Sequence, residues 1–150
     1  MNNDDVIATL NDLIETCKDG EQGFLTCSED VKDLELKAYF TSRSARCADS
    51  AEELQELVLA YGGKPETSSH ISGALHRRWV DIRSMISGKS EEAVLEECER
   101  GEDIAKRNYE DALAKALPDD VRRVVEAQYN GVRRNHDQVK NFRDHARAQR

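Results

Sequence analysis

The stretch IETCKDGEQGF (residues 14–24) returns in altered form as LEECERGEDIA (residues 95–105). Four positions agree within a core of seven, and they pair Glu15 with Glu96, Cys17 with Cys98, Gly20 with Gly101 and Glu21 with Glu102. The apolar residues around both stretches are separated by steps of three and four, which is typical of an amphipathic helix. Each stretch therefore predicts part of a long helix, and the repeat favours a fold with two related halves.

The same periodicity continues outward from the two stretches. It predicts four long helices, at about residues 4–28, 34–61, 90–116 and 119–147. Asp33 is a suitable N-cap for the second helix, Gly62 is a suitable stop after it, and Pro118 suits the first turn of the fourth. The first and second helices are joined by a few residues, and so are the third and fourth. Each consecutive pair is therefore predicted to form an antiparallel hairpin.

A long connection separates the two predicted hairpins. Within it, HISGALHRRWVDIRSMIS (residues 70–87) has apolar residues at helical spacing and includes Trp79, the one tryptophan of the chain. We expect a shorter amphipathic helix at about 69–87 that crosses the bundle. Two hairpins linked in this way predict a single all-α domain over residues 1–150, an antiparallel four-helix bundle with ferritin-like connectivity.

Composition excludes several classes of protein. The chain of 150 residues has 22 Lys and Arg against 30 Asp and Glu, a formal net charge of -8, so we do not expect nucleic-acid binding, which needs a basic face. No apolar run approaches the ~20 residues of a membrane span. The opening MNNDDVIATL has no signal-peptide pattern, which predicts a cytoplasmic protein without membrane attachment. The four cysteines lack CxxC spacing and are expected to be core thiols.

The repeated acidic residues are the first candidates for a site. Glu21 and Glu102 each lie four residues after a cysteine and next to the apolar stripe of their helix. A carboxylate near a core is unfavourable unless it is paired or binds a metal, so the two side chains are expected to point at one shared place. Glycine inside a helix costs about 1 kcal/mol relative to alanine. Gly20 and Gly101 therefore indicate that a neighbouring group comes close.

Polar residues of the second and fourth helices fall near the same axis: Arg43, Glu53, Glu56, Gln128 and His136. Glu21 and Glu102 are interpreted first as ion-paired, with Arg43 or another cation, or as exposed at the edge of the stripe. A metal or small-cation site is the alternative. The simpler interpretation of His136 is that it forms a hydrogen bond between helices. Arg43 and Gln128 are expected to fix helix register through polar contacts.

Five segments together resemble a bacterial ferritin-like four-helix-bundle family of undescribed function. They are LNDLIETCKDGEQGF (10–24), KDLELKAYF (32–40), SGALHRRWVDI (72–82), LEECERGED (95–103) and AQYNGVRRNHDQV (127–139). The resemblance covers essentially the whole chain. It implies kinship with a superfamily that includes di-iron oxidases and iron-storage proteins. In those proteins one glutamate comes from each of two helices and a Glu-x-x-His motif comes from each of the other two.

The resemblance implies a set of candidate ligands for iron or manganese: Glu21, Glu102, Glu53, Glu56 and His136. This chain departs from the family pattern, since none of its histidines has a glutamate three residues before it. A di-iron oxidoreductase is therefore the last of three predicted functions. The first is a non-catalytic structural or interaction protein, expected to be a homodimer. The second is a metal-binding protein with an atypical carboxylate and histidine site. The sequence identifies no small-molecule substrate.

Overall fold

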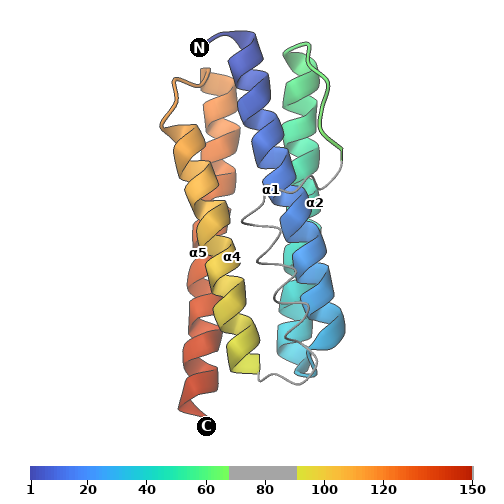
Figure 1. Ribbon diagram of the computed structural model, residues 1–150, viewed down its shortest axis with the longest axis vertical. Coiled ribbons are helices and arrows are strands. Elements are labelled where there is room, and N and C mark those ends of the chain that lie inside the picture. The colour runs from blue at the N-terminus through green and yellow to red at the C-terminus, as the bar shows by residue number, and fades with distance from the viewer. Residues whose placement is uncertain (68–90, 150) are drawn as a thin grey trace.

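The computed structural model describes residues 1–67 and 91–149, and these residues form four helices and no strand. The helices are α1 (Asn3–Asp30), α2 (Leu34–Ala60), α4 (Glu91–Leu113) and α5 (Asp119–Ala148), shown in Figure 1. The all-α prediction is thereby confirmed. The crossover helix expected at 69–87 lies outside the described residues. None of the described helices has both the length and the apolar character that crossing a membrane requires.

The first two helices begin and end at recognisable signals. The Asn2 side chain accepts a hydrogen bond from the Asp5 N–H at 2.8 Å and so caps α1. Asp33 caps α2 in the same way, accepting from the Leu36 N–H at 3.0 Å. After α2 the chain turns at Gly62, whose φ of 81° lies in the left-handed region that glycine adopts without strain.

The junction between α4 and α5 differs from the expectation. The helix predicted to reach residue 116 ends at Leu113. Pro118 is the N-cap of α5 rather than part of its first turn, and proline disfavours a helical conformation in the residue before it. The Arg122 guanidinium donates to the carbonyl oxygens of Leu113 at 3.1 Å and Lys115 at 2.5 Å. These bonds satisfy carbonyl groups that the end of α4 leaves free.

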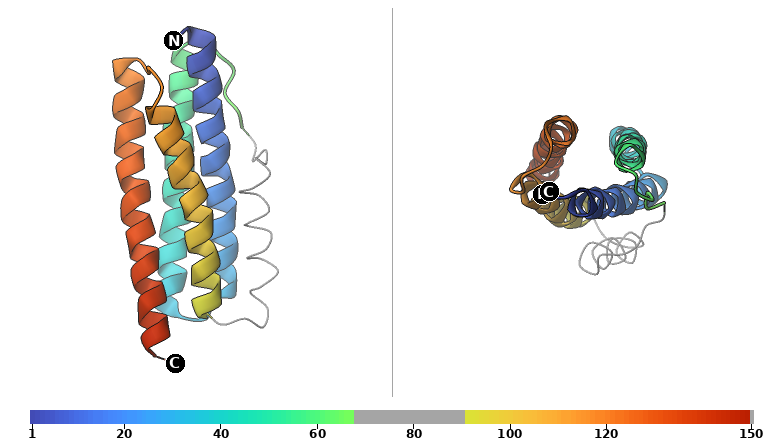
Figure 2. Two further views of the ribbon diagram at one scale, coloured as in Figure 1. Left: turned by 60° about the vertical axis from the view of Figure 1, so that its left-hand side comes forward. Right: turned by 90° about the horizontal axis from the view of Figure 1, so that it is seen from above.

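The helices pack as two pairs. α1 lies along α2 and α4 lies along α5, and the helices of each pair run in opposite directions (Figure 1). The pairs meet where α1 contacts α4 and where α2 contacts α5. Seen from above in Figure 2, α2 and α5 are the neighbours with the widest separation.

The core consists of two clusters of buried apolar side chains. One cluster, toward the N-terminal end of α1, includes Leu10, Ile14, Leu54, Val58 and Val121. The other, toward the C-terminal end of α1, includes Phe24, Cys27, Phe40, Leu95 and Val139. Burying one such side chain contributes roughly 1.5–3 kcal/mol, so the two clusters stabilise the two ends of the bundle. The middle of the bundle is built differently.

Candidate functional site

A cavity of about 480 Å³ lies between the two apolar clusters and is lined by all four described helices. α1 and α4 line it with buried residues, among them Cys17, Gly20, Phe24, Gly101, Glu102 and Tyr109. α2 and α5 also contribute exposed residues, among them Arg46, Asp49, Glu53, Ala127 and Arg134. The cavity therefore opens to solvent between α2 and α5, the two widely separated helices.

Small residues create this space. Gly20, Gly101, Ala105 and Gly131 line the cavity, and none of them has a side chain long enough to fill it. A Cβ atom at Gly20 would lie 3.1 Å from Cys47 Sγ, which is closer than an ordinary van der Waals contact. The close approach predicted from the repeated glycine is thus confirmed at Gly20. Gly101, its counterpart in the repeat, lines the same cavity.

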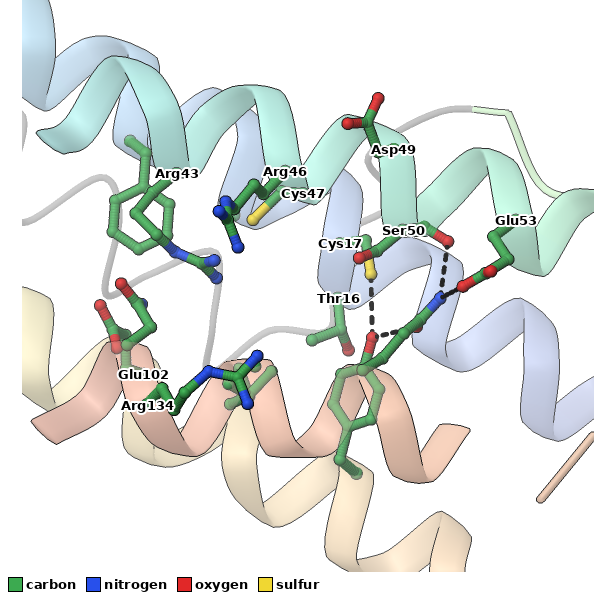
Figure 3. A pocket seen from close by; sticks show the side chains of 18 of the residues that line it. Thr16, Cys17, Arg43, Arg46, Cys47, Asp49, Ser50, Glu53, Glu102 and Arg134 are labelled. Atoms are coloured by element: carbon green, nitrogen blue, oxygen red, sulfur yellow. Dashed lines mark hydrogen bonds between the residues drawn. The ribbon is translucent and has the colours of Figure 1, made fainter. Parts of the chain in front are cut away.

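A hydrogen-bond network closes one end of the cavity and links all four helices (Figure 3). The Tyr109 hydroxyl donates to Gln128 Oε1 at 2.8 Å and lies 3.2 Å from Cys17 Sγ. The Gln128 amide donates to the Ser50 carbonyl at 3.2 Å and to Glu53 Oε1 at 2.8 Å. Burial raises the pKa of the Cys17 thiol to about 11, so the thiol is protonated and donates to the tyrosine oxygen.

Glu102 lies toward the other end of the cavity (Figure 3). Glu102 is only 3% exposed. Neither of its carboxyl oxygens has a hydrogen-bond partner of normal geometry in the described part of the chain. Burial raises the pKa of Glu102 to about 8, against smaller lowering effects of the Arg43 guanidinium and the Asn135 side chain. At neutral pH the carboxyl therefore retains its proton. Strongly shifted groups of this kind concentrate at functional sites.

Three arginines line the cavity on the side of Glu102. Arg43 and Arg46 come from α2 and Arg134 comes from α5, and in Figure 3 their guanidinium groups point into the same space. Arg43 lies over the Phe24 ring, with its guanidinium carbon 5.8 Å from the ring centroid. Its Nε is buried and has no hydrogen-bond partner among the described residues.

The residues predicted as metal ligands do not all meet here. Glu102 and Glu53 line the cavity, but Glu53 accepts the hydrogen bond of Gln128 at the opposite end. Glu21 does not line it. Its side chain is 33% exposed and its carboxylate lies 3.6 Å from Lys18 Nζ, so the repeated acids have different surroundings.

His136 and Glu56 complete the predicted ligand set. His136 Nε2 lies 2.6 Å from Asp103 Oδ1, a contact between α5 and α4, and neither residue lines the cavity. Glu56 is exposed on α2. Within residues 1–67 and 91–149, no group of three or more His, Cys, Asp or Glu side chains is placed to hold a metal ion. Iron or manganese binding stays a prediction from the sequence.

Several lining residues were not singled out from the sequence. They are Arg46, Arg134 and Tyr109. A signal was present in α5, where Gln128, Gly131 and Asn135 occupy helical steps of three and four between the buried residues Val125 and Val139. A stretch of polar and small residues that interrupts an apolar stripe marks a part of the bundle that apolar side chains do not fill.

Comparison with known proteins relates the chain to one family. The sequence profile of a family described as a domain of unknown function (DUF2383) matches residues 5–115. The matched range contains α2 and α4, which carry Arg43, Arg46 and Glu102 of the cavity, and all of α1 except its first two residues. No curated protein matches the chain.

Proposed function

The chain belongs to the DUF2383 family, whose function is unknown, and we propose that it is a non-catalytic binding protein that holds a small molecule between its helices. The observation that carries the proposal is the cavity of about 480 Å³ with the unpartnered carboxyl of Glu102 inside it. Ligand pockets span roughly 300–1,000 Å³ and combine apolar walls with a few polar groups. The lining of Phe24, Ala105 and Tyr109 around Glu102 and Arg43 has this composition.

The energetics support binding over a purely structural role. A buried carboxyl without a hydrogen-bond partner is unfavourable, and side chains around an unfilled space lose packing contacts that a filled core would supply. Both features occur at one level of the bundle, between two clusters that are filled with apolar side chains. A bundle selected for rigidity alone would fill this level in the same way as its ends.

The state of the candidate nucleophiles supports binding over catalysis. The thiolate is the reactive form of cysteine. Burial raises the pKa of the two cysteines that line the cavity, to about 11 for Cys17 and about 12 for Cys47. Neither thiol is therefore activated near neutral pH. Tyr109 is bonded within the network and burial raises its pKa as well.

The proposal includes a ferritin-like bundle of two antiparallel hairpins. The packing of α1 with α2 and of α4 with α5 supports it, together with the long connection from α2 to α4. In bundles of this kind, ligand and cofactor sites lie between facing helices. An experimental structure that includes residues 68–90 would test the connectivity.

Three further expectations from the sequence belong to the proposal: a cytoplasmic location, a homodimer, and iron or manganese as the alternative ligand. Light scattering tests the dimer, and a mass equal to one chain at high concentration would contradict it. Elemental analysis of protein purified without chelator tests the metal. Stoichiometric iron or manganese would favour the alternative function.

A dye titration tests the proposed function. N-phenyl-1-naphthylamine is uncharged and fluoresces in apolar surroundings, and we expect it to bind the wild-type protein. Gly131→Leu should lower the affinity about tenfold by filling the cavity. A Cβ at Gly131 meets only Arg134 Nη2, at 3.7 Å, so the larger side chain enters open space. Leucine also favours the helix over glycine, so unfolding by urea should show no loss of stability.

Asn130→Leu is the matched control, because it adds the same side chain at the adjacent, exposed position of α5. Its dye affinity should stay within about twofold of wild type, which is a change below 0.5 kcal/mol. Equal binding to the wild-type and Gly131→Leu proteins would place the dye outside the cavity and contradict the proposal. Failure of the dye to bind the wild-type protein would count against it as well.

A further inference from the structure

We propose that the ligand of this cavity is a small organic anion, with a phosphate, sulfonate or carboxylate group held by Arg43, Arg46 and Arg134 and an apolar body held beside it. The inference rests on the proposed function and specifies the chemical class of the molecule bound.

The arrangement of the three arginines is the first argument. Arg43 and Arg46 are three residues apart on α2 and so project from the same side of the helix, while Arg134 faces them from α5 (Figure 3). None of the three forms an ion pair with another described residue. Guanidinium groups gathered around one space repel one another unless an anion lies between them. Their planar N–H groups suit the oxygens of phosphate, sulfonate and carboxylate.

The acidic residues of the cavity leave this positive charge uncompensated. The Asp49 carboxylate points away from the arginines in Figure 3. Glu53 lies at the far end and accepts the Gln128 hydrogen bond. Glu102 is close by, but burial raises its pKa to about 8, so it is uncharged at neutral pH. A local cluster of cations thus lies within a chain whose formal net charge is -8.

The buried polar atoms without partners give a second, independent argument. Arg43 Nε and both oxygens of Glu102 are buried at the cavity and have no hydrogen-bond partner of normal geometry in the described part of the chain. The two residues do not pair with each other, although both line the same space. An anion placed between them accepts from the Arg43 Nε–H and from the O–H of protonated Glu102. One ligand group would therefore give a partner to the Arg43 Nε–H and to the O–H of Glu102.

The other residues that line the cavity indicate the chemistry of the rest of the ligand. Phe24, Ala105, Tyr109 and Val132 present carbon surface to the cavity. A bare inorganic ion would leave this surface unfilled, whereas an anion with an aromatic or aliphatic body would cover it. The volume of about 480 Å³ accommodates a molecule with two or three fused or linked rings.

A pair of matched dyes tests the inference. 8-Anilinonaphthalene-1-sulfonate has the same ring skeleton as N-phenyl-1-naphthylamine and carries one additional sulfonate. We expect it to bind the wild-type protein about tenfold more tightly than the uncharged dye at low salt, since it adds charge-assisted hydrogen bonds. Arg46→Gln and Arg134→Gln should each weaken the anionic dye about fivefold and leave the uncharged dye within about twofold. Both arginines are exposed on their helices, so these variants are expected to fold.

Arg123→Gln is the matched control, because it removes the same charge from an exposed position of α5 that does not line the cavity. It should change the affinity of neither dye. Equal affinity of the two dyes for the wild-type protein would overturn the anion inference and leave the proposed function standing. If Arg123→Gln weakened binding of the anionic dye as much as Arg134→Gln does, the affinity would depend on net charge alone. That result would also overturn the anion inference. Absence of binding by both dyes would contradict the proposed function itself.

Discussion

Glu21 and Glu102 occupy equivalent places in the repeated motif and yet have different surroundings. The reason lies three residues earlier in each helix. Lys18 precedes Glu21 and draws its carboxylate to the surface as an ion pair. The equivalent position before Glu102 is Glu99, whose carboxylate pairs with Arg143 of α5. No lysine precedes Glu102 by three residues, and its side chain stays inside the bundle, where burial holds its proton.

This burial predicts a pH-dependent contribution to stability. The pKa of Glu102 is about 8 in the folded protein and near 4.5 when the group is unperturbed, so unfolding releases a proton between these values. The contribution of Glu102 to stability therefore falls as pH rises from about 5 to 8, and is constant below and above that window. Glu102→Gln removes this effect. The difference in unfolding free energy, variant minus wild type, should therefore increase by a few kcal/mol from pH 5 to pH 8, as measured by urea denaturation.

The comparison with wild type matters because Asp19 also has a raised pKa, about 6, caused first by burial and then by Glu15. Its contribution is the same in both proteins and cancels in the difference. Glu56→Gln, at an exposed position of α2, is the control and should follow the wild-type curve. Parallel curves for wild type and Glu102→Gln would show that Glu102 is ionised in the folded protein.

At the scale of the helix, two glycines of the cavity have different roles. Gly20 lies where Cys47 of α2 approaches α1, and a Cβ there would be 3.1 Å from the sulfur. Gly131 lies on α5 next to open space. Glycine at the first position permits helix packing, and glycine at the second leaves volume for a ligand.

The two positions should therefore respond differently to alanine. Gly131→Ala is expected to stabilise the protein by up to about 1 kcal/mol, the gain in helix propensity. Gly20→Ala should gain less or lose stability, because Cys47 must move. In a Cys47→Ala background the two substitutions should become similar, as urea denaturation of all variants would show. An equal gain from Gly20→Ala with Cys47 present would contradict the role assigned to that contact.

Helix ends could be predicted where one residue decides them. Asp33 caps α2 and Gly62 follows its end because capping and positive φ depend on the local chain. The end of α4 at Leu113 was misplaced because it depends on Pro118 and also on Arg122, which bonds back to carbonyls several residues away. The sequence pattern contains Arg122 but does not indicate that its side chain folds back.

In the bundle as assembled, the cavity depends on distances between helices, which the periodicity of the sequence does not contain. Apolar residues at steps of three and four do face inward, as Leu10, Phe40 and Val125 show. It did not indicate that α2 and α5 stand apart and leave the middle of the bundle open (Figure 2). The side chains that fill a bundle can be predicted from a stripe, whereas a space results from the residues of all four helices together.

The two apolar clusters and the cavity thus divide the bundle into three levels. The ends are stabilised by buried apolar side chains, and the middle contains the arginines, Glu102 and the Tyr109 network. The stability of the fold comes mainly from the ends. Changes that fill the middle should therefore affect ligand binding more than folding.

Amide resonances of the glycines offer the most direct test that the middle of the bundle binds a small molecule. In ¹H–¹⁵N spectra, titration with 8-anilinonaphthalene-1-sulfonate should shift the resonances of Gly20, Gly101 and Gly131, which line the cavity from three helices. Those of Gly62 and Gly63, beyond the end of α2, should not move. Saturable shifts confined to the first three glycines are the predicted result. Shifts at Gly62 and Gly63 alone, or no shift at the three cavity glycines, would contradict the account.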